Sequence, residues 1–190
     1  MVTPAGYTLL GGDSGVQPQL PADRGLIAWT QPPYVLTGGS LLGVAGALHL
    51  RRLRRVPACS VTSIVTYVGG AGSALTSGQC FAALYTAAGE LIAQSVDQAT
   101  AWASQGVKTM TLAGGPYTLP GGDYYIGVWF NGTTAPAIAR SASYATAMTN
   151  VGLSAPNFEA ATANTGVTTT APASLGTQTT SMYEYWFALA

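Results

Sequence analysis

The ten residues DYYIGVWFNG, positions 123–132, decide the fold class of this chain. From Tyr124 to Phe130 every even position is apolar, and the odd positions carry Tyr125, Gly127 and Trp129. A period of two, with aromatic and β-branched residues enriched, predicts a β-strand. The strand should end at the dipeptide that follows it, because Asn-Gly is typical of a hairpin turn.

Similar patterns recur at regular spacing on both sides of this stretch. Gly89 sits between two of them, where a hairpin turn requires a positive φ. Residues 97–105 are expected to form a helical turn or a loop, and residues 165–181 a surface loop. The expected strands are residues 47–56, 61–68, 79–86, 90–95, 107–113, 123–130, a weak one within 151–163, and a closing one at 182–190. Short strands separated by Gly and Pro predict an all-β domain, a β-sandwich of jelly-roll type.

The N-terminal part lacks this regularity. Glycines and prolines interrupt residues 1–25, and an irregular terminus of this kind usually needs a neighbour to order it. Residues 26–46 continue without a clear period. We therefore expect an extended N-terminal arm and leading segment over residues 1–46, and the β-sandwich domain over residues 47–190.

The composition is poor in charge. Charged residues make up 7% of the chain and the formal net charge is zero, whereas an ordinary soluble domain is about 25% charged. Hydrophobic residues reach 48%, too many for a disordered chain. Interface cores are depleted in charge, so much of this surface could be covered in an assembly. A host proteome biased toward Gly, Ala and Thr is the alternative explanation.

Membrane insertion and secretion are not expected. The most apolar stretch, residues 41–50, is too short to span a bilayer and runs directly into arginines. Residues 1–4 lack the basic start and apolar run of a signal peptide. Cys59 and Cys80 each lie near the start of an expected strand, so a bridge between them is conceivable. Free thiols are favoured, because nothing indicates an oxidising compartment.

Residues that carry chemistry are sparse. His49 is the chain's one histidine, so a hydrolytic triad is hard to build. Asp97 and Asp123 are the candidates for a glycosidase pair, but nothing in their spacing brings them together. Zinc spacing, a calcium loop and a phosphate-binding glycine loop are all missing from the sequence. We expect no enzyme, no metal and no cofactor.

Basic residues concentrate in one expected strand, which holds four of the seven: Arg51, Arg52, Arg54 and Arg55. One interpretation is an anion or nucleic-acid patch. Strand alternation, however, splits these residues two and two across the faces of a sheet, which argues against one continuous patch. We favour contacts with a neighbouring protein surface in an assembly and expect no nucleic acid. Trp29 is a further candidate for such an assembly contact.

Trp102 is the candidate for contact with a glycan. It lies in the expected loop close to Gln98, Thr100 and Gln105, and polar neighbours of this kind suit a sugar that stacks on an aromatic ring. The competing interpretation is that the aromatic residues of this chain form the core.

Four stretches together resemble a known type of protein. They are DRGLIAW at 23–29, LYTAAGELIAQS at 84–95, QATAW at 98–102 followed by Gly106, and LPGGDYYIG at 119–127. This pattern resembles the β-sandwich module of virion proteins from tailed phages of actinobacteria, often called minor tail or tail-fibre proteins. The resemblance covers roughly residues 23–140.

The resemblance implies a virion component without a cofactor, commonly a homotrimer, assembled in the cytoplasm of the host bacterium. The first hypothesis is a minor tail or tail-fibre protein that binds other virion proteins through its arm and a host-surface glycan through its sandwich. A capsid decoration protein that stabilises the head is one alternative, favoured by the short arm and the lack of a stalk. A stand-alone carbohydrate-binding module, or a lyase acting on polysaccharide, is another.

Overall fold

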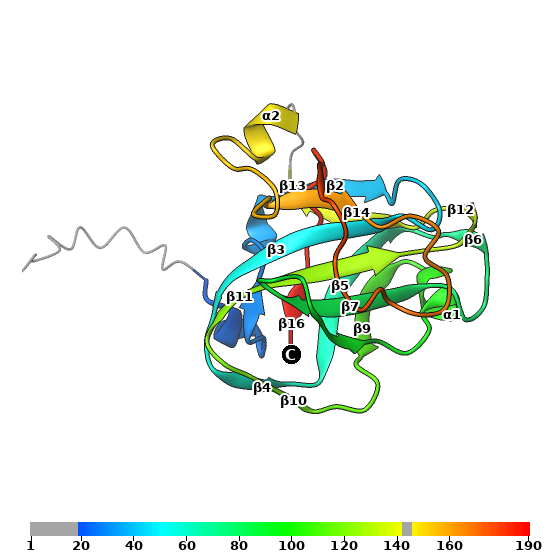
Figure 1. Ribbon diagram of the computed structural model, residues 1–190. Helices are drawn as coiled ribbons and strands as arrows, with labels where there is room; N and C mark the ends of the chain where they lie inside the picture. Colours follow the sequence, from blue (N-terminus) through cyan, green and yellow to red (C-terminus); the bar gives the residue numbers. More distant parts are fainter. Residues whose placement is uncertain (1–18, 142–145) are drawn as a thin grey trace, which may run out of the picture.

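Two main antiparallel sheets pack face to face as a β-sandwich, which confirms the fold class expected from the sequence (Figure 1). The computed structural model describes residues 19–141 and 146–190. A hydrophobic core fills the space between the sheets, as sandwich packing requires.

The first sheet, called sheet B here, has the strand that contains residues 123–129 at its centre. Its order is β15-β14-β3-β11-β7-β8, and every neighbouring pair is antiparallel. The strands are β3 (Leu48–Val56), β7 (Phe81–Thr86), β8 (Leu91–Gln94), β11 (Gly122–Trp129), β14 (Ala160–Ala163) and β15 (Thr179–Thr180). The β7–β8 pair is the predicted hairpin, and Gly89 in its turn has φ +89°.

The second sheet, sheet A, is built around β5 (Ser63–Gly70). One edge of β5 pairs along its length with β9 (Gly106–Thr111). The other edge pairs with β16 (Ala188–Leu189) and with β13 (Ala137–Ser141). Beyond these lie β1 (Ala28–Trp29), which pairs with β16, and β2 (Leu36–Leu41), which pairs with β13.

Short elements close the ends of the sandwich. They are two small sheets, β4 (Cys59–Val61) with β10 (Tyr117–Leu119) and β6 (Ser73–Leu75) with β12 (Gly132–Thr134), the helical turns α1 (Ala99–Trp102) and α2 (Thr146–Thr149), and the 3-10 turns η1 (Pro21–Arg24) and η2 (Pro33–Val35).

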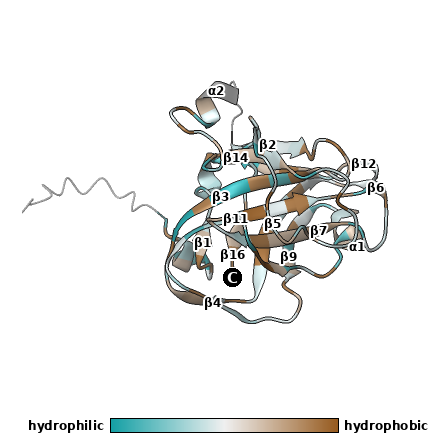
Figure 2. Cartoon of the chain, viewed as in Figure 1, coloured by the Kyte–Doolittle hydropathy of each residue, from teal (hydrophilic) through white to brown (hydrophobic). Residues whose placement is uncertain are grey.

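The core between the sheets follows from strand alternation. Leu53, Leu84 and Ile126 point inward from sheet B, and Ile64 and Met110 point inward from sheet A; all five are fully buried. Figure 2 shows β7 and β11 mainly in brown, whereas the arginine-bearing part of β3 is teal. Alternation thus places the apolar positions that the sequence predicted on packed faces.

A second hydrophobic cluster lies on the outer face of sheet B, where the chain itself covers the sheet. Residues 164–178 cross this face, and Val167 and Ala171 are buried against it (Figure 1, orange). Gly127 of β11 packs closely here, because a Cβ would lie 2.9 Å from Leu48 Cδ1 and would force that side chain to shift. The expected surface loop is therefore also the cover of one face.

Three details differ from the sequence prediction. The regular fold begins before residue 47, because β1 and β2 pair into sheet A. Strand β11 ends at Trp129, two residues before the Asn131-Gly132 dipeptide, but no hairpin follows, since β12 pairs with β6 instead. The closing strand is short: only Ala188–Leu189 pairs continuously, inserted between β1 and β5. Long-range pairing with other segments, which local sequence patterns do not encode, accounts for each difference.

Candidate functional site

The four arginines of β3 lie on opposite faces of the sheet, as alternation predicted. Arg52 and Arg54 are on the outer face, in line with Leu48 and Leu50 of the outer cluster. Arg51 is on the inner face and is buried. Arg55 is exposed at a β-bulge, with φ +54°. No single basic patch results from this arrangement.

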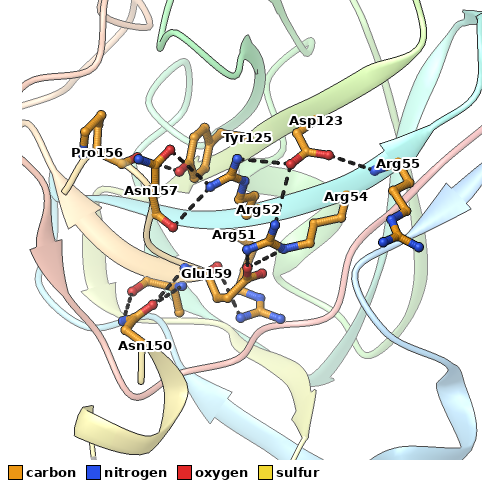
Figure 3. A network of polar contacts seen from close by, with 11 residues as sticks. Arg51, Arg52, Arg54, Arg55, Asp123, Tyr125, Asn150, Pro156, Asn157 and Glu159 are labelled. Atoms are coloured by element: carbon orange, nitrogen blue, oxygen red, sulfur yellow. Dashed lines mark hydrogen bonds and ion pairs between the residues drawn. The ribbon is translucent and has the colours of Figure 1, made fainter. Parts of the chain in front are cut away.

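Asp123, at the start of β11, gathers three of these residues (Figure 3). Its carboxylate accepts hydrogen bonds from Arg52 Nη2 at 3.0 Å and from the Arg55 backbone N–H at 2.9 Å, and it lies 3.7 Å from Arg54 Nη1. Burial opposes ionisation of this carboxyl group, but the Arg55 N–H and the two guanidinium groups outweigh it and lower the pKa of Asp123. Asp123 therefore joins β3 to β11 as a carboxylate.

Glu159 and Asn157 tie the same arginines to the segment before β14 (Figure 3). Arg54 forms an ion pair with Glu159. Arg52 donates to the backbone oxygen of Asn157 at 3.1 Å and lies over the Tyr125 ring, 5.7 Å from its centre. The Tyr125 hydroxyl in turn donates to the Pro156 oxygen at 2.6 Å. These contacts hold residues 156–159 against sheet B.

Arg51 performs a similar role between the sheets. Its guanidinium donates to the Glu159 backbone oxygen at 3.2 Å and to Gln31 Oε1 at 3.3 Å. Burial lowers the pKa of Arg51, and the nearby carboxylates of Glu184 and Glu159 oppose that effect. Arg51 thus connects the leading segment to the β14 side of the sandwich.

These partners bear on the predicted assembly contacts. Arg51, Arg52 and Arg54 are engaged within the chain, which leaves little of their hydrogen-bonding capacity for another molecule. Within residues 19–141 and 146–190, no partner is found for the Arg55 guanidinium. Of the four arginines, Arg55 is therefore the one whose charged group is available at the surface.

Trp102, the predicted glycan contact, is fully buried, so the expectation of an exposed ring is wrong. It ends the short helix α1, whose backbone holds it through the Trp102 N–H bond to Gln98 O at 2.8 Å. The ring belongs to the core cluster between the sheets. A loop position alone did not reveal that this segment folds inward and closes the sandwich.

Asp97 and Asp123 do not share a cleft. Asp97 accepts from the Cys80 backbone N–H at 3.1 Å, next to the strand end where Phe81 pairs with Trp129. Asp123 lies at the opposite end of β11, roughly 20 Å away at the rise of an extended strand. Both carboxylates serve structural roles, and their separation is too large for a glycosidase pair.

Other chemical sites receive no support from the geometry. Cys59 and Cys80 are free thiols, and burial raises the pKa of each. The described part of the chain holds no cluster of three or more His, Cys, Asp or Glu side chains arranged for a metal ion. It also contains no helix long and apolar enough to cross a membrane.

The outer face of sheet A is the most unusual surface of the molecule, because its strands project no charge from it. The strands of sheet A contain two charged residues, Lys108 and Arg140. Lys108 is in register with Thr66, and Arg140 is two residues from Ile138 in β13, so each lies on the same side as a neighbour that is buried on the inner side. Every outward position of these strands is therefore apolar, hydroxyl-bearing or glycine.

An apolar groove crosses this face in two connected hollows of about 370 and 340 Å³. Leu36 and Tyr67 line both hollows. Tyr67 is 42% exposed and Val107, its partner in register, is 68% exposed. The remaining lining residues are Arg24, Leu26, Pro33, Val65 and Trp186 in the first hollow and Gly38, Gly39, Gly69 and Ala139 in the second. We call this surface the sheet A groove.

Trp29 lies beside the sheet A groove. It pairs with Ala188 in register and packs, half-buried, against the small cluster of Val65 and Trp186. Its position on the uncharged face is compatible with the predicted assembly contact. Sequence reasoning missed the groove itself, since Leu36, Tyr67 and Val107 come from three segments that only the sheet brings together.

His49 lines a third hollow, of about 350 Å³, next to the loop between β2 and β3. Its side chain is buried, and its ring is perpendicular to that of Tyr185 in a T-shaped contact, with 6.0 Å between ring centres. Burial lowers the pKa of His49 to about 4, so the imidazole is neutral at pH 7. Among the described residues, neither ring nitrogen has a hydrogen-bond partner.

Comparison with known proteins does not assign the chain to a family. No protein-family model matches the sequence, and no curated protein matches it.

Proposed function

We propose that this chain is a non-catalytic structural protein of a bacteriophage virion, of the minor tail or tail-fibre type, that acts by packing against other proteins. The observation that carries the proposal is the sheet A groove, on an outer face whose strands project no charged side chain; Arg24, from the leading segment, is the charged residue that lines it. The sequence stretches that resemble actinobacterial phage tail modules supply the virion context.

Packing through this face agrees with the physics of interfaces. Interface cores exclude charged groups and are enriched in aromatic side chains. Tyr67 and Trp186 line the sheet A groove, Trp29 lies beside it, and no charged strand residue lines it. Burial of apolar area stabilises an association by about 25 cal/mol per Å² before the costs of ordering. A homotrimer in which each copy contributes this face is the proposed assembly.

The proposed attachments are divided between two parts of the chain. Residues 1–18, which lie outside the described residues, are proposed to bind a neighbouring virion protein, with Trp29 and Arg55 at the border of that contact. The sandwich is proposed to present a host-surface glycan site. The predicted contact Trp102 has no part in it, because its ring is buried.

Locating the chain in the particle tests the virion proposal. Antibody against the purified chain, detected by gold labelling in electron micrographs of particles of the encoding phage, should mark the tail. Labelling over the whole head would overturn the tail assignment in favour of capsid decoration. Absence of the chain from purified particles would overturn the virion proposal altogether.

Solution mass tests the packing surface separately. Light scattering coupled to size-exclusion chromatography should show a trimer for the natural chain and a monomer for the double variant Tyr67→Lys, Val107→Lys. The matched control Tyr34→Lys changes an exposed aromatic residue that does not line the groove and should leave the trimer intact. A natural chain that remains monomeric at every concentration contradicts self-association.

A further inference from the structure

The hollow beside His49 combines a buried polar group without a partner, the imidazole, with several threonine hydroxyl groups. His49 is 4% exposed, and both of its ring nitrogens lack a partner within the described residues. A buried polar group left without a partner destabilises the fold, so such a group calls for an explanation. The hollow it lines is the adjoining space from which a partner can approach.

The strands order the other polar groups of the hollow in a row. Thr162 of β14 is directly opposite His49 of β3, and Thr179 of β15 is directly opposite Thr162. Directly opposite residues on adjacent strands have Cβ atoms about 5 Å apart, so these three side chains succeed one another across the sheet. Thr165 and Thr177 add two further exposed hydroxyl groups.

The opposite wall is apolar and is formed by the loop between β2 and β3. Val44, 73% exposed, and Ala45 lie on this wall. Gly43 rests against the imidazole, since a Cβ there would lie 3.0 Å from His49 Cε1. The ring nitrogens are covered in this structure, so a ligand bonds to them only if this short loop moves aside. Glycine at position 43 keeps the Cε1 edge of the ring free of a side chain.

We propose that this hollow binds an uncharged saccharide unit. Sugar hydroxyls both donate and accept hydrogen bonds, as do threonine hydroxyls and a neutral imidazole, while the C–H face of a sugar suits the wall of Val44 and Ala45. No charged side chain lines the hollow, which disfavours phosphate, sulfate or a sugar acid. Its volume of about 350 Å³ lies within the range of small-molecule sites.

This inference deepens the proposed attachment function and rests on it only for the biological source of the sugar. The row His49–Thr162–Thr179 is on the inner side of sheet B at its β15 edge, whereas the sheet A groove is on the outer side of the other sheet. Self-association through the groove and sugar binding in the hollow can therefore be tested independently.

The single histidine provides a direct test, because its ring signals in a ¹H–¹³C NMR spectrum need no further assignment. The full chain is titrated into the millimolar range with D-glucose, D-galactose, D-mannose, N-acetyl-D-glucosamine and L-rhamnose, and with ethylene glycol and sodium sulfate as controls. We expect a saturable shift of the His49 Cε1–H signal with at least one sugar and none with either control. Saturable shifts with none of the sugars, or equal shifts with ethylene glycol or sulfate, would overturn the proposal.

Matched variants locate the site. Thr162→Val keeps the side-chain shape, removes one hydroxyl, and should weaken sugar binding by about tenfold, the usual effect of one hydrogen bond. Gly43→Val should abolish binding by filling the space beside the imidazole. Thr109→Val makes the same change as the first variant on the outer face of sheet A, and it should leave binding unchanged.

The outcomes separate this inference from the proposed function. If folded Thr162→Val and Gly43→Val both bind sugar as the natural chain does, the hollow is not the site. A chain found in the phage tail that binds no sugar overturns this inference alone. Sugar binding by a chain absent from particles overturns the virion proposal alone.

Discussion

The two outer faces of the sandwich differ in how far the chain covers them. Residues 164–178 cover the outer face of sheet B, with Val167 and Ala171 buried there and Leu175 packed against them. The outer face of sheet A receives only the short leading segment, and Tyr67 and Val107 remain exposed beside the groove. A sheet face that the chain covers only in part, and whose strands project no charged side chain, is the face on which a partner can replace water.

Polar contacts explain why the cover of sheet B stays in place. Gln94 of β8 donates to Thr169 O at 3.0 Å and accepts from the Ala171 N–H at 2.6 Å. Trp129 Nε1 donates to Thr168 O at 2.8 Å. The loop is therefore part of the folded domain, and changes beneath it should cost far more than equal changes on the open face.

Removing the largest side chain beneath the cover should have the largest effect. Trp129 is fully buried and packs against Phe81, with ring centres 5.3 Å apart. We expect Trp129→Ala to lower the free energy of unfolding by about 3–5 kcal/mol, because it leaves a cavity and frees the Thr168 oxygen. Urea unfolding followed by circular dichroism measures this change. A loss below 1 kcal/mol would show that the loop does not seal this face.

Removing the Asp123 carboxylate from sheet B should lower the free energy of unfolding by less than Trp129→Ala does, and the loss should depend on pH. Asp123→Asn removes the charge that Arg52 and Arg54 share, and we expect a loss of about 1–3 kcal/mol at pH 7. The pKa of Asp123 is lowered in the folded chain, so its contribution is full at neutral pH and is lost as the pH falls below about 4. The difference between variant and natural chain should therefore shrink in acid. A difference that stays constant down to pH 2 contradicts the role of this charge.

Releasing the cover without emptying the core should have a smaller effect. We expect Gln94→Ala to lower the free energy of unfolding by about 1 kcal/mol and to expose residues 164–178 to proteases, since both bonds to the loop are lost. Limited proteolysis with mass spectrometry locates the cut. Gln105→Ala, at an exposed glutamine away from this face, is the control and should be cut no faster than the natural chain.

A substitution on the outer face of sheet A should have the smallest effect on the free energy of unfolding of the monomer. Tyr67→Ser should change the free energy of unfolding of the monomer by no more than about 0.5 kcal/mol, because its ring is 42% exposed. The measurement uses dilute protein, where association does not contribute. A loss of 2 kcal/mol or more would mean that Tyr67 belongs to a packed core, and the contrast between the two faces would disappear.

Local sequence patterns predicted most of the strands in the middle of the chain, and they did so for a clear reason. Positions such as Ile126 in β11 and Leu53 in β3 alternate with residues of the other face, and alternation needs no knowledge of the partner strand. The same rule correctly separated Arg51 from Arg52. It failed for β2, whose Gly38 and Gly39 show no pattern and become a strand only by pairing with β13.

The candidate sites were less accessible to sequence reasoning. Trp102 was expected outside and lies inside, because burial of α1 depends on how both sheets close over it. His49, which the sequence offered only as the one histidine for a hydrolytic triad, lies buried beside Thr162, more than a hundred residues away in the chain. Contacts at such separation arise from sheet order, which no local period encodes.

The sequence by itself determined the sandwich, because a period of two with Gly and Pro between short apolar runs is a property of each segment alone. It also determined the scarcity of charge and of catalytic side chains. Only the tertiary structure decided that one outer face is covered and the other left open, and that the arginines bind within the chain. Those features depend on which distant segments pair, and pairing is decided by the burial and hydrogen bonding of the whole fold.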